Sequence, residues 1–212
     1  MVDLASVPAP RPLSKRVIPP QPLLSAVLVL SFVALLYVIE AVDTALGHRL
    51  DGEGVIPRDF SQWDNLIWYP LLHGSWSHLT SNAVPLLILG FLATSGGIKQ
   101  FLQVTAVIWL TSGLGVWLVG YPASHIGASG LVFGYLVFLL VRGIFARSVW
   151  QILVAVLVFA AYGWALWGVL PGTPGVSWEG HLFGAIGGVL AAWGVARDAR
   201  RAPAPPPASL TV

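Results

Sequence analysis

Ser129 is the residue of this sequence best suited to nucleophilic chemistry. It lies in the segment Gly127-Ala128-Ser129-Gly130, within a stretch apolar enough to lie in a membrane, where polar side chains are costly and mark functional sites. A serine becomes a nucleophile when a base removes its proton and fixed donors hold the oxyanion that forms. The flanking glycines let the backbone approach a substrate carbonyl, and a helix starting at Ser129 leaves its N–H free to donate. The alternative interpretation is a patch of small residues that packs helices together.

His181 is the candidate base for Ser129. A neutral imidazole, with an ordinary pKa near 6.5, accepts a proton at neutral pH. No buried Asp or Glu is evident to orient the ring, so we expect a Ser-His dyad rather than a triad. The alternative is a structural histidine bonded to a backbone carbonyl.

Two stripes of glycine are expected to bring the serine and the histidine together. Gly184 and Gly188 follow the histidine on one helix face, and Gly130 and Gly134 follow the serine. Such stripes let helix backbones approach closely.

His78 and Asn82 are separated by four residues and therefore share one helix face. Their imidazole and amide N–H groups suit donation to an oxyanion, although hydrogen bonding between helices is the alternative role. His73 is expected to pack the preceding loop against the helix start. We interpret His125 and His48 as ordinary loop residues.

A zinc site is the metal alternative for these histidines. His73, His78 and His181 supply enough imidazoles for three ligands. The sequence has no His-Glu-x-x-His segment and no cysteine, and Glu179 is the only carboxylate near these helix starts. We therefore expect no metal and no cofactor.

The composition predicts an all-α membrane protein. Of its 212 residues 56% are hydrophobic and only 9% charged, against about 25% charged in soluble domains. Six apolar segments have the length of a membrane-spanning helix: residues 23–46, 78–95, 101–119, 129–145, 149–170 and 180–196. We expect a six-helix membrane domain at 22–198 between disordered tails at 1–21 and 199–212, both rich in proline. The basic residues lie at helix ends, so the net charge of +2 does not indicate a nucleic-acid partner.

The distribution of positive charge predicts the orientation. Six spans place nine basic residues on one side and only Arg49 and Arg58 on the other. By the positive-inside rule both termini are then cytoplasmic. The helices that begin near His78, Ser129 and His181 all enter from the opposite side, so these groups are predicted to converge at the extracytoplasmic face.

Two connections are expected to border this face. Residues 47–72 form the longest loop, and its aromatic residues are expected at the level of the lipid headgroups: Trp63, Trp68 and Tyr69. Glu40 and Asp43, near the outer end of the first segment, are likewise expected at the interface. Residues 171–175 are rich in proline and glycine and are interpreted as a mobile cap.

Three segments taken together resemble the signatures of rhomboid intramembrane serine proteases. They are residues 73–82, 127–130 and 181–188, and they fall on the second, fourth and sixth predicted helices. The resemblance extends over about residues 23–197 and implies the six-helix core of that family.

The resemblance also implies roles for individual residues. Ser129 would be the nucleophile and His181 the general base, with His78, Asn82 and the Ser129 N–H forming the oxyanion hole. The supporting residues would be Gly127, Gly130, Phe133 and His73. Phe133 stands where the family usually has a tyrosine that stacks on the histidine, and stacking survives that change. The usual Trp-Arg pair of the first loop is replaced by Gln62-Trp63-Asp64-Asn65, which leaves the anchoring of that loop open.

The implied activity is cleavage of single-span membrane proteins near the extracytoplasmic face, within a cell membrane and with lipid as the other partner. Abundant arginine favours a bacterial plasma membrane. The alternative is a catalytically silent rhomboid-like protein that binds client transmembrane helices. Neither interpretation requires nucleic acid or metal.

Overall fold

The computed structural model describes residues 15–173 and 175–201 as a bundle of helices without a sheet. Within those residues the helices are α1 Pro22–Ala45, α2 Asn65–Trp68, α3 Trp76–Ala93, α4 Ile98–Val119, α5 Ser129–Ala146, α6 Val149–Tyr162 and α7 Trp178–Arg201. Short 3₁₀ segments, η5 Thr94–Gly96 and η6 Gly163–Val169, extend α3 and α6. A single pair of residues, Val55 and His125, forms an isolated β-bridge.

Six of these helices are long and apolar enough to cross a membrane, so the predicted all-α, six-span fold is confirmed. The spans are Pro22–Ala45, Trp76–Gly96, Ile98–Val119, Ser129–Ala146, Val149–Val169 and Trp178–Arg201. Each differs from its predicted segment by a few residues at the ends. The sixth continues farther than expected, because Arg200 and Arg201 still belong to the helix.

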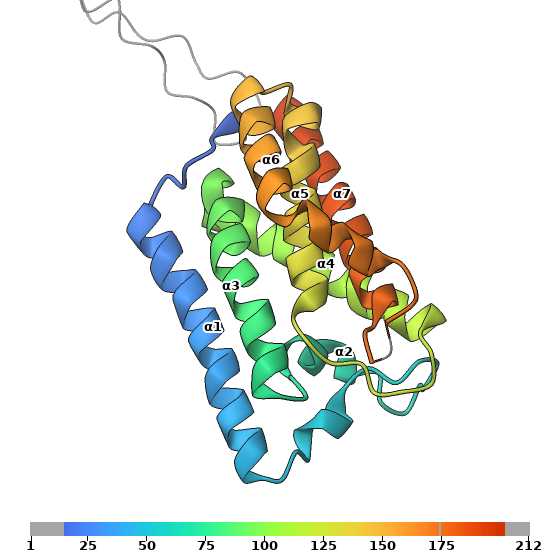
Figure 1. Cartoon of the computed structure of the whole chain (residues 1–212). Coiled ribbons are helices and arrows are strands. Elements are labelled where there is room, and N and C mark those ends of the chain that lie inside the picture. The colour runs from blue at the N-terminus through green and yellow to red at the C-terminus, as the bar shows by residue number, and fades with distance from the viewer. Residues whose placement is uncertain (1–14, 174, 202–212) are drawn as a thin grey trace, which may run out of the picture.

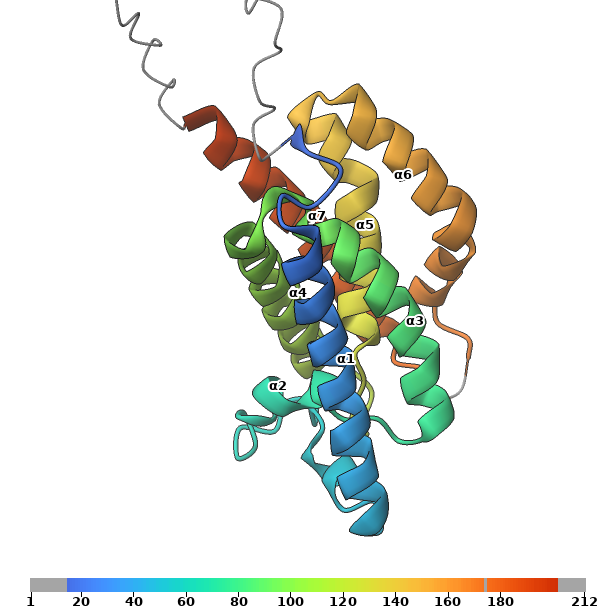
Figure 2. The same cartoon turned by 90° about the vertical axis from the view of Figure 1, so that its left-hand side faces the viewer.

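α5 is the central helix of the bundle, and four of the other five spans pack against it (Figure 1). It packs against α7, α6, α3 and α4, whereas α1 packs on α3 at one edge (Figures 1 and 2). Most residues of α5 are buried, but few of α6 are. The core of the molecule is therefore built on the helix that begins at Ser129.

The closest helix contact joins α5 and α7 through their glycines. A Cβ on Gly184 would overlap the backbone of Gly130, and one on Gly188 would overlap the Gly134 carbonyl. This is the pairing expected of two matching glycine stripes. It brings the first turns of α5 and α7 side by side.

The acidic residues of α1 correct one expectation. Glu40 is 1% exposed and Asp43 2%, so neither lies at the lipid interface. Both belong to the face of α1 that also buries Val29, Val33 and Leu36, since residues three or four apart in a helix lie on the same side. The prediction failed because the helix face, and not nearness to the helix end, determines where these carboxylates point.

The loop between α1 and α3 is anchored on the end of α4. Arg58 donates to the carbonyls of Leu118 at 3.1 Å and Gly120 at 3.2 Å. In return, Trp117 Nε1 donates to the Asp59 carbonyl at 3.1 Å. These hydrogen bonds anchor the first loop, although the Trp-Arg pair that is usual in the family is absent.

Tyr69 is not an interfacial residue, contrary to expectation. It is 4% exposed, and its hydroxyl donates to the Trp109 carbonyl at 2.9 Å. Trp63 and Trp68 are exposed, as a headgroup position requires. The phenol faces inward because its ring and hydroxyl find partners on α4.

Part of the predicted N-terminal tail contacts the bundle. Arg142 donates to Ser95 Oγ at 2.6 Å and to the Arg16 carbonyl at 3.2 Å, and Gln151 donates to that same carbonyl. Residues 1–14 and 202–212 of the predicted tails lie outside the described residues.

Candidate active site

Ser129 is the first residue of α5 and is half-buried. The four N–H groups that open a helix have no intrahelical acceptor, so the Ser129 N–H points out of the helix start. Ala128 just before it is fully buried, which fixes the entry of the chain into α5.

Gly127 allows the side chain of His78 to approach the loop before Ser129. Its φ is +119°, a region that L side chains rarely adopt. A Cβ there would lie 2.7 Å from Cε1 and 2.8 Å from Nε2 of His78, and 3.9 Å from Nδ2 of Asn82. Both predicted oxyanion donors therefore face the backbone that immediately precedes the serine.

Helix α3 positions these two donors. Ser75 caps α3, its hydroxyl accepting from the His78 N–H at 3.2 Å. One turn later, Asn82 Nδ2 donates to the His78 carbonyl at 3.2 Å. Because an amide nitrogen carries two hydrogens, one N–H of Asn82 is left for another acceptor.

The side chain of His73 supports the loop before Ser129 through a hydrogen bond. Its Nε2 accepts from the Ala128 N–H at 3.3 Å, and its ring meets that of His78 edge-on with centroids 5.0 Å apart. Burial lowers the pKa of His73 to about 4. The ring is thus neutral at pH 7, as an acceptor of that N–H must be.

His181 lies in the first turn of α7, with its tautomer set by a backbone group. Its Nδ1 is 2.9 Å from the Gly168 carbonyl of η6. A carbonyl can only accept, so Nδ1 carries the hydrogen and Nε2 keeps the lone pair. The histidine is bonded to a backbone carbonyl and retains a basic nitrogen, so the two interpretations made from the sequence are compatible.

Phe133 stacks on the imidazole of His181. The ring centroids are 4.1 Å apart and the planes are inclined by 9°. Phe133 lies one turn after Ser129 on α5. The stack therefore fixes the position of His181 on α7 relative to α5. This is the stack expected to survive the change from tyrosine.

A cavity of about 810 Å³ connects the predicted polar groups. Ser129, His181, His78 and Asn82 all line it, and it continues past Pro85 and Leu89 of α3 and the α6–η6 wall. Thr173 and Gly175, from the segment interpreted as a cap, also line it. The four groups thus converge on one space, as the predicted topology required.

His125 was underestimated from the sequence. We expected an ordinary loop residue, but it is 4% exposed. Its Nε2 donates to the Tyr121 carbonyl at 2.9 Å, and its Nδ1 is 2.8 Å from Ser177 Oγ. His125 thereby joins the loop before α5 to the loop before α7, a role that neighbouring Pro122 and Ser124 did not indicate.

Two of the three imidazoles weighed as zinc ligands each use one ring nitrogen to bond the backbone. Nε2 of His73 binds the backbone of Ala128, and Nδ1 of His181 binds that of Gly168. Glu179 is buried two residues before His181, although no buried carboxylate was expected there. In the described part of the chain these residues do not form a metal-ligand group.

Comparison with known proteins defines the class. Residues 61–198 match the family model described as the Rhomboid domain. The chain belongs to the rhomboid family, as predicted, and is a multi-pass membrane protein.

Its relatives include uncharacterised proteins of mycobacteria. One from Mycobacterium tuberculosis (strain ATCC 25618 / H37Rv) is 46% identical over 183 residues, covering 82% of this chain and 76% of the relative. One from Mycobacterium leprae is 43% identical over 180 residues, covering 81% and 71%. The family contains serine intramembrane proteases and pseudoproteases, so the activity of this member has to be argued from its own site.

Proposed function

We propose that this protein is an intramembrane serine protease with Ser129 as nucleophile and His181 as general base. The observation that carries the proposal is the state of His181: its Nδ1 is bound to the Gly168 carbonyl, so its basic Nε2 is available in the cavity that Ser129 lines. A pseudoprotease would not require a histidine held in this tautomer.

The proposed reaction uses Ser129 and His181 as a nucleophile and base that line one cavity. Nε2 of His181 takes the proton of Ser129 as Oγ attacks the substrate carbonyl, and the Oγ–carbon bond forms. When the carbon–nitrogen bond breaks, the imidazolium returns that proton to the leaving amine. Water then hydrolyses the acyl-enzyme with His181 as base again.

His78, Asn82 and the Ser129 N–H serve as donors to the oxyanion. The first two face the Gly127 backbone, and the third belongs to the first residue of α5. Donors fixed before the reaction stabilise the developing charge without reorganising.

The substrate is a single transmembrane helix whose cleaved segment unwinds into the cavity. The cavity extends along α3 and the α6–η6 wall, and α6 has the smallest buried share of the six spans, so we expect the substrate to enter on this side. The distribution of basic residues supports a cavity that opens on the extracytoplasmic side, with both termini in the cytoplasm. The mycobacterial relatives favour a bacterial plasma membrane.

Labelling with a fluorophosphonate probe tests the proposal. The purified, detergent-solubilised wild type should be labelled, as should Ser61→Ala, which changes an exposed loop serine. Ser129→Ala and His181→Ala should not be labelled, and all four proteins should retain the same helix content by circular dichroism. A folded wild type that resists labelling even after Thr173 and Gly175 are replaced to open the cap would favour the client-binding pseudoprotease.

A further inference from the structure

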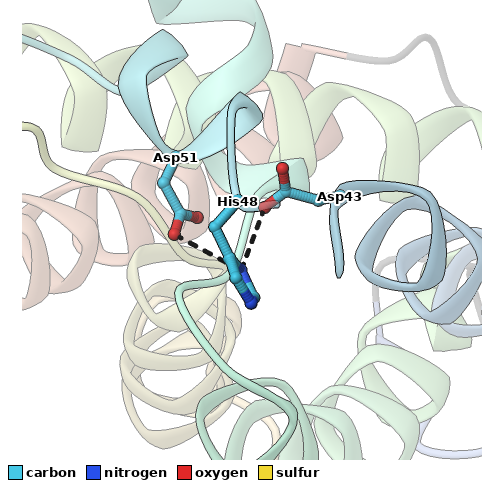
Figure 3. Close-up of side chains that lie close together, drawn as sticks. All are labelled: Asp43, His48 and Asp51. Atoms are coloured by element: carbon cyan, nitrogen blue, oxygen red, sulfur yellow. Dashed lines mark ion pairs between the residues drawn. The ribbon is translucent and has the colours of Figure 1, made fainter. Parts of the chain in front are cut away.

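Three potential ligand side chains meet where α1 ends (Figure 3). Asp43, His48 and Asp51 each offer one donor atom, and these atoms all lie within 4.8 Å of one another. His48 Nδ1 is 3.6 Å from Asp43 Oδ2 and 3.8 Å from Asp51 Oδ2. The cluster is separate from the pair Ser129 and His181.

The turn that ends α1 builds this cluster. The His48 N–H bonds the Asp43 carbonyl at 2.9 Å and the Gly47 N–H bonds that of Thr44 at 3.2 Å, which is the pattern of a Schellman motif. Gly47 supplies the left-handed conformation, with φ +71°. The Leu50 N–H then donates to Asp43 Oδ1 at 2.7 Å. The chain is folded back so that His48 and Asp51 face the carboxylate of Asp43.

Glu40 is the independent observation that points to a bound cation. It is 1% exposed, and neither of its carboxylate oxygens has a hydrogen-bond partner within the described residues. The charges that act on it are those of Asp51, Asp43 and His48, in decreasing order. Glu40 lies one turn before Asp43 on the same buried face of α1, so it is within range of the charges of the cluster.

The cluster lacks the positive charge that this many carboxylates require. Among residues 15–173 and 175–201, only His48 lies within ion-pair distance of these acids. Asp51 Oδ1 is also enclosed without a partner. The end of a helix adds partial negative charge of its own. Buried carboxylates in such a field are stabilised when they pair with or coordinate a cation.

We propose that Asp43, His48 and Asp51 bind a divalent transition-metal ion, with Zn²⁺ the best fit. Zinc combines imidazole nitrogen with carboxylate oxygen, at bond lengths of about 2.0–2.2 Å that set tetrahedral ligands ~3.4 Å apart. The two measured separations from His48 Nδ1 are close to that value. The two aspartates balance the charge of the ion, and Glu40, one turn before Asp43 on α1, adds a further carboxylate that favours a cation nearby. Calcium takes 6–8 oxygen ligands, and an imidazole does not suit it.

The ion would fix the end of α1 to the loop that leads into Ser129. The Asp51 carbonyl accepts from Ser124 Oγ at 2.7 Å, and Ser124 lines the cavity. The Val55–His125 bridge makes a second link between the same two loops. The metal thus has a structural function and takes no part in bond cleavage.

Zinc binding to the purified protein in detergent, with its affinity tag removed, tests the site. After equilibrium dialysis against ZnCl₂, the wild type should retain one zinc ion per chain. Asp51→Asn and His48→Ala should weaken binding by at least about tenfold. Asp64→Asn, an exposed aspartate farther along the same loop, is the matched control and should bind as the wild type does. The same dialysis with Ser129→Ala makes the result independent of protease activity.

Thermal unfolding in the presence of ZnCl₂ and of CaCl₂ separates the remaining outcomes. Zinc should raise the midpoint of the wild type and of Asp64→Asn, and it should not raise that of His48→Ala. The side chain of His48 is half-exposed, so this variant is expected to fold even if Asp51→Asn does not. Equal zinc retention by wild type and His48→Ala would overturn the proposal, and preference for calcium over zinc would overturn the assignment of the metal.

Discussion

Helices α7 and α6 both pack on α5, but in opposite ways. α7 meets α5 at the level of the backbone, through Gly184 and Gly188. α6 contacts α5 with one face and leaves large side chains such as Val156, 60% exposed, on the outside. His181 depends on both, because α7 carries it and η6, the continuation of α6, accepts its N–H. The proposed dyad is therefore built into the tightly packed side, and only its orienting acceptor comes from the loosely packed side.

The largest effects should follow changes at the α5–α7 junction. Ser129→Ala and His181→Ala should each reduce the cleavage of a single-span reporter in proteoliposomes by about 10⁴-fold or more. Phe159→Ala, an exposed change on α6, should leave cleavage within a few-fold of the wild type. Residual cleavage in Ser129→Ala above that of empty liposomes would contradict the assigned nucleophile.

The oxyanion donors of α3 should rank next. His78→Ala and Asn82→Ala should each lower kcat by about 10²–10³-fold, because the charge they stabilise exists only in the transition state. Val84→Ala, on the exposed side of α3, is the control for helix packing. A rise in KM with unchanged kcat would instead assign these residues to substrate binding.

The burial of His73 should make the stability of the protein sensitive to acid. The pKa of His73 falls from 6.5 to about 4 on burial, so below pH 6.5 the unfolded chain binds more protons than the folded one. The neutral ring therefore contributes fully to the free energy of unfolding above pH 6.5. This contribution is lost as the pH falls toward 4, and the loss is at most about 3 kcal/mol. The wild type should therefore lose more unfolding free energy than His73→Gln between pH 7 and 4. Parallel stability profiles for the two proteins would show that His73 titrates normally.

A change of packing volume should distinguish α7 from α6 directly. Gly188→Val should lower the free energy of unfolding by about 1–3 kcal/mol, because its side chain would overlap the α5 backbone. Val156→Leu on α6 should stay within about 0.5 kcal/mol. Thermal unfolding in detergent measures both, and equal losses would mean that α6 is packed as tightly as α7.

The smallest effect should come from the stacked ring. Phe133→Leu should reduce kcat about threefold to tenfold, since an aromatic pair contributes about 0.5–1.5 kcal/mol. Phe159→Leu changes the same type of residue on the outer face of α6 and should have no effect. An unchanged kcat in Phe133→Leu would show that the Gly168 carbonyl orients His181 without the stack.

The sequence predicts the parts of this molecule that depend on residue type and spacing. Apolar length predicts the six spans, and the glycines of α5 and α7 predict their close contact. The even number of helices predicts that Ser129, His78, Asn82 and His181 line one space. These features are local, or they follow from topology alone.

The features that could not be predicted from the sequence depend on tertiary contacts, in particular on how the loops fold back onto the helices. The acceptor for His181 is a backbone carbonyl, which every residue has, so Gly168 carried no signal. Tyr69 turns inward because its hydroxyl bonds the Trp109 carbonyl of α4, Glu40 lies on the buried face of α1, and His125 bonds the loops on both sides of it. Charge and aromatic character predicted interface positions for Glu40 and Tyr69, and tertiary contacts overrode them.

The bond from His181 to Gly168 makes the wall of the cavity part of the acid–base chemistry. If η6 moves away, Nδ1 loses its acceptor and the proton is free to reside on either nitrogen. A fraction of the molecules would then present an N–H toward the cavity and would be unable to accept a proton there. Movement of this wall would therefore lower the fraction of molecules in which His181 can accept a proton in the cavity.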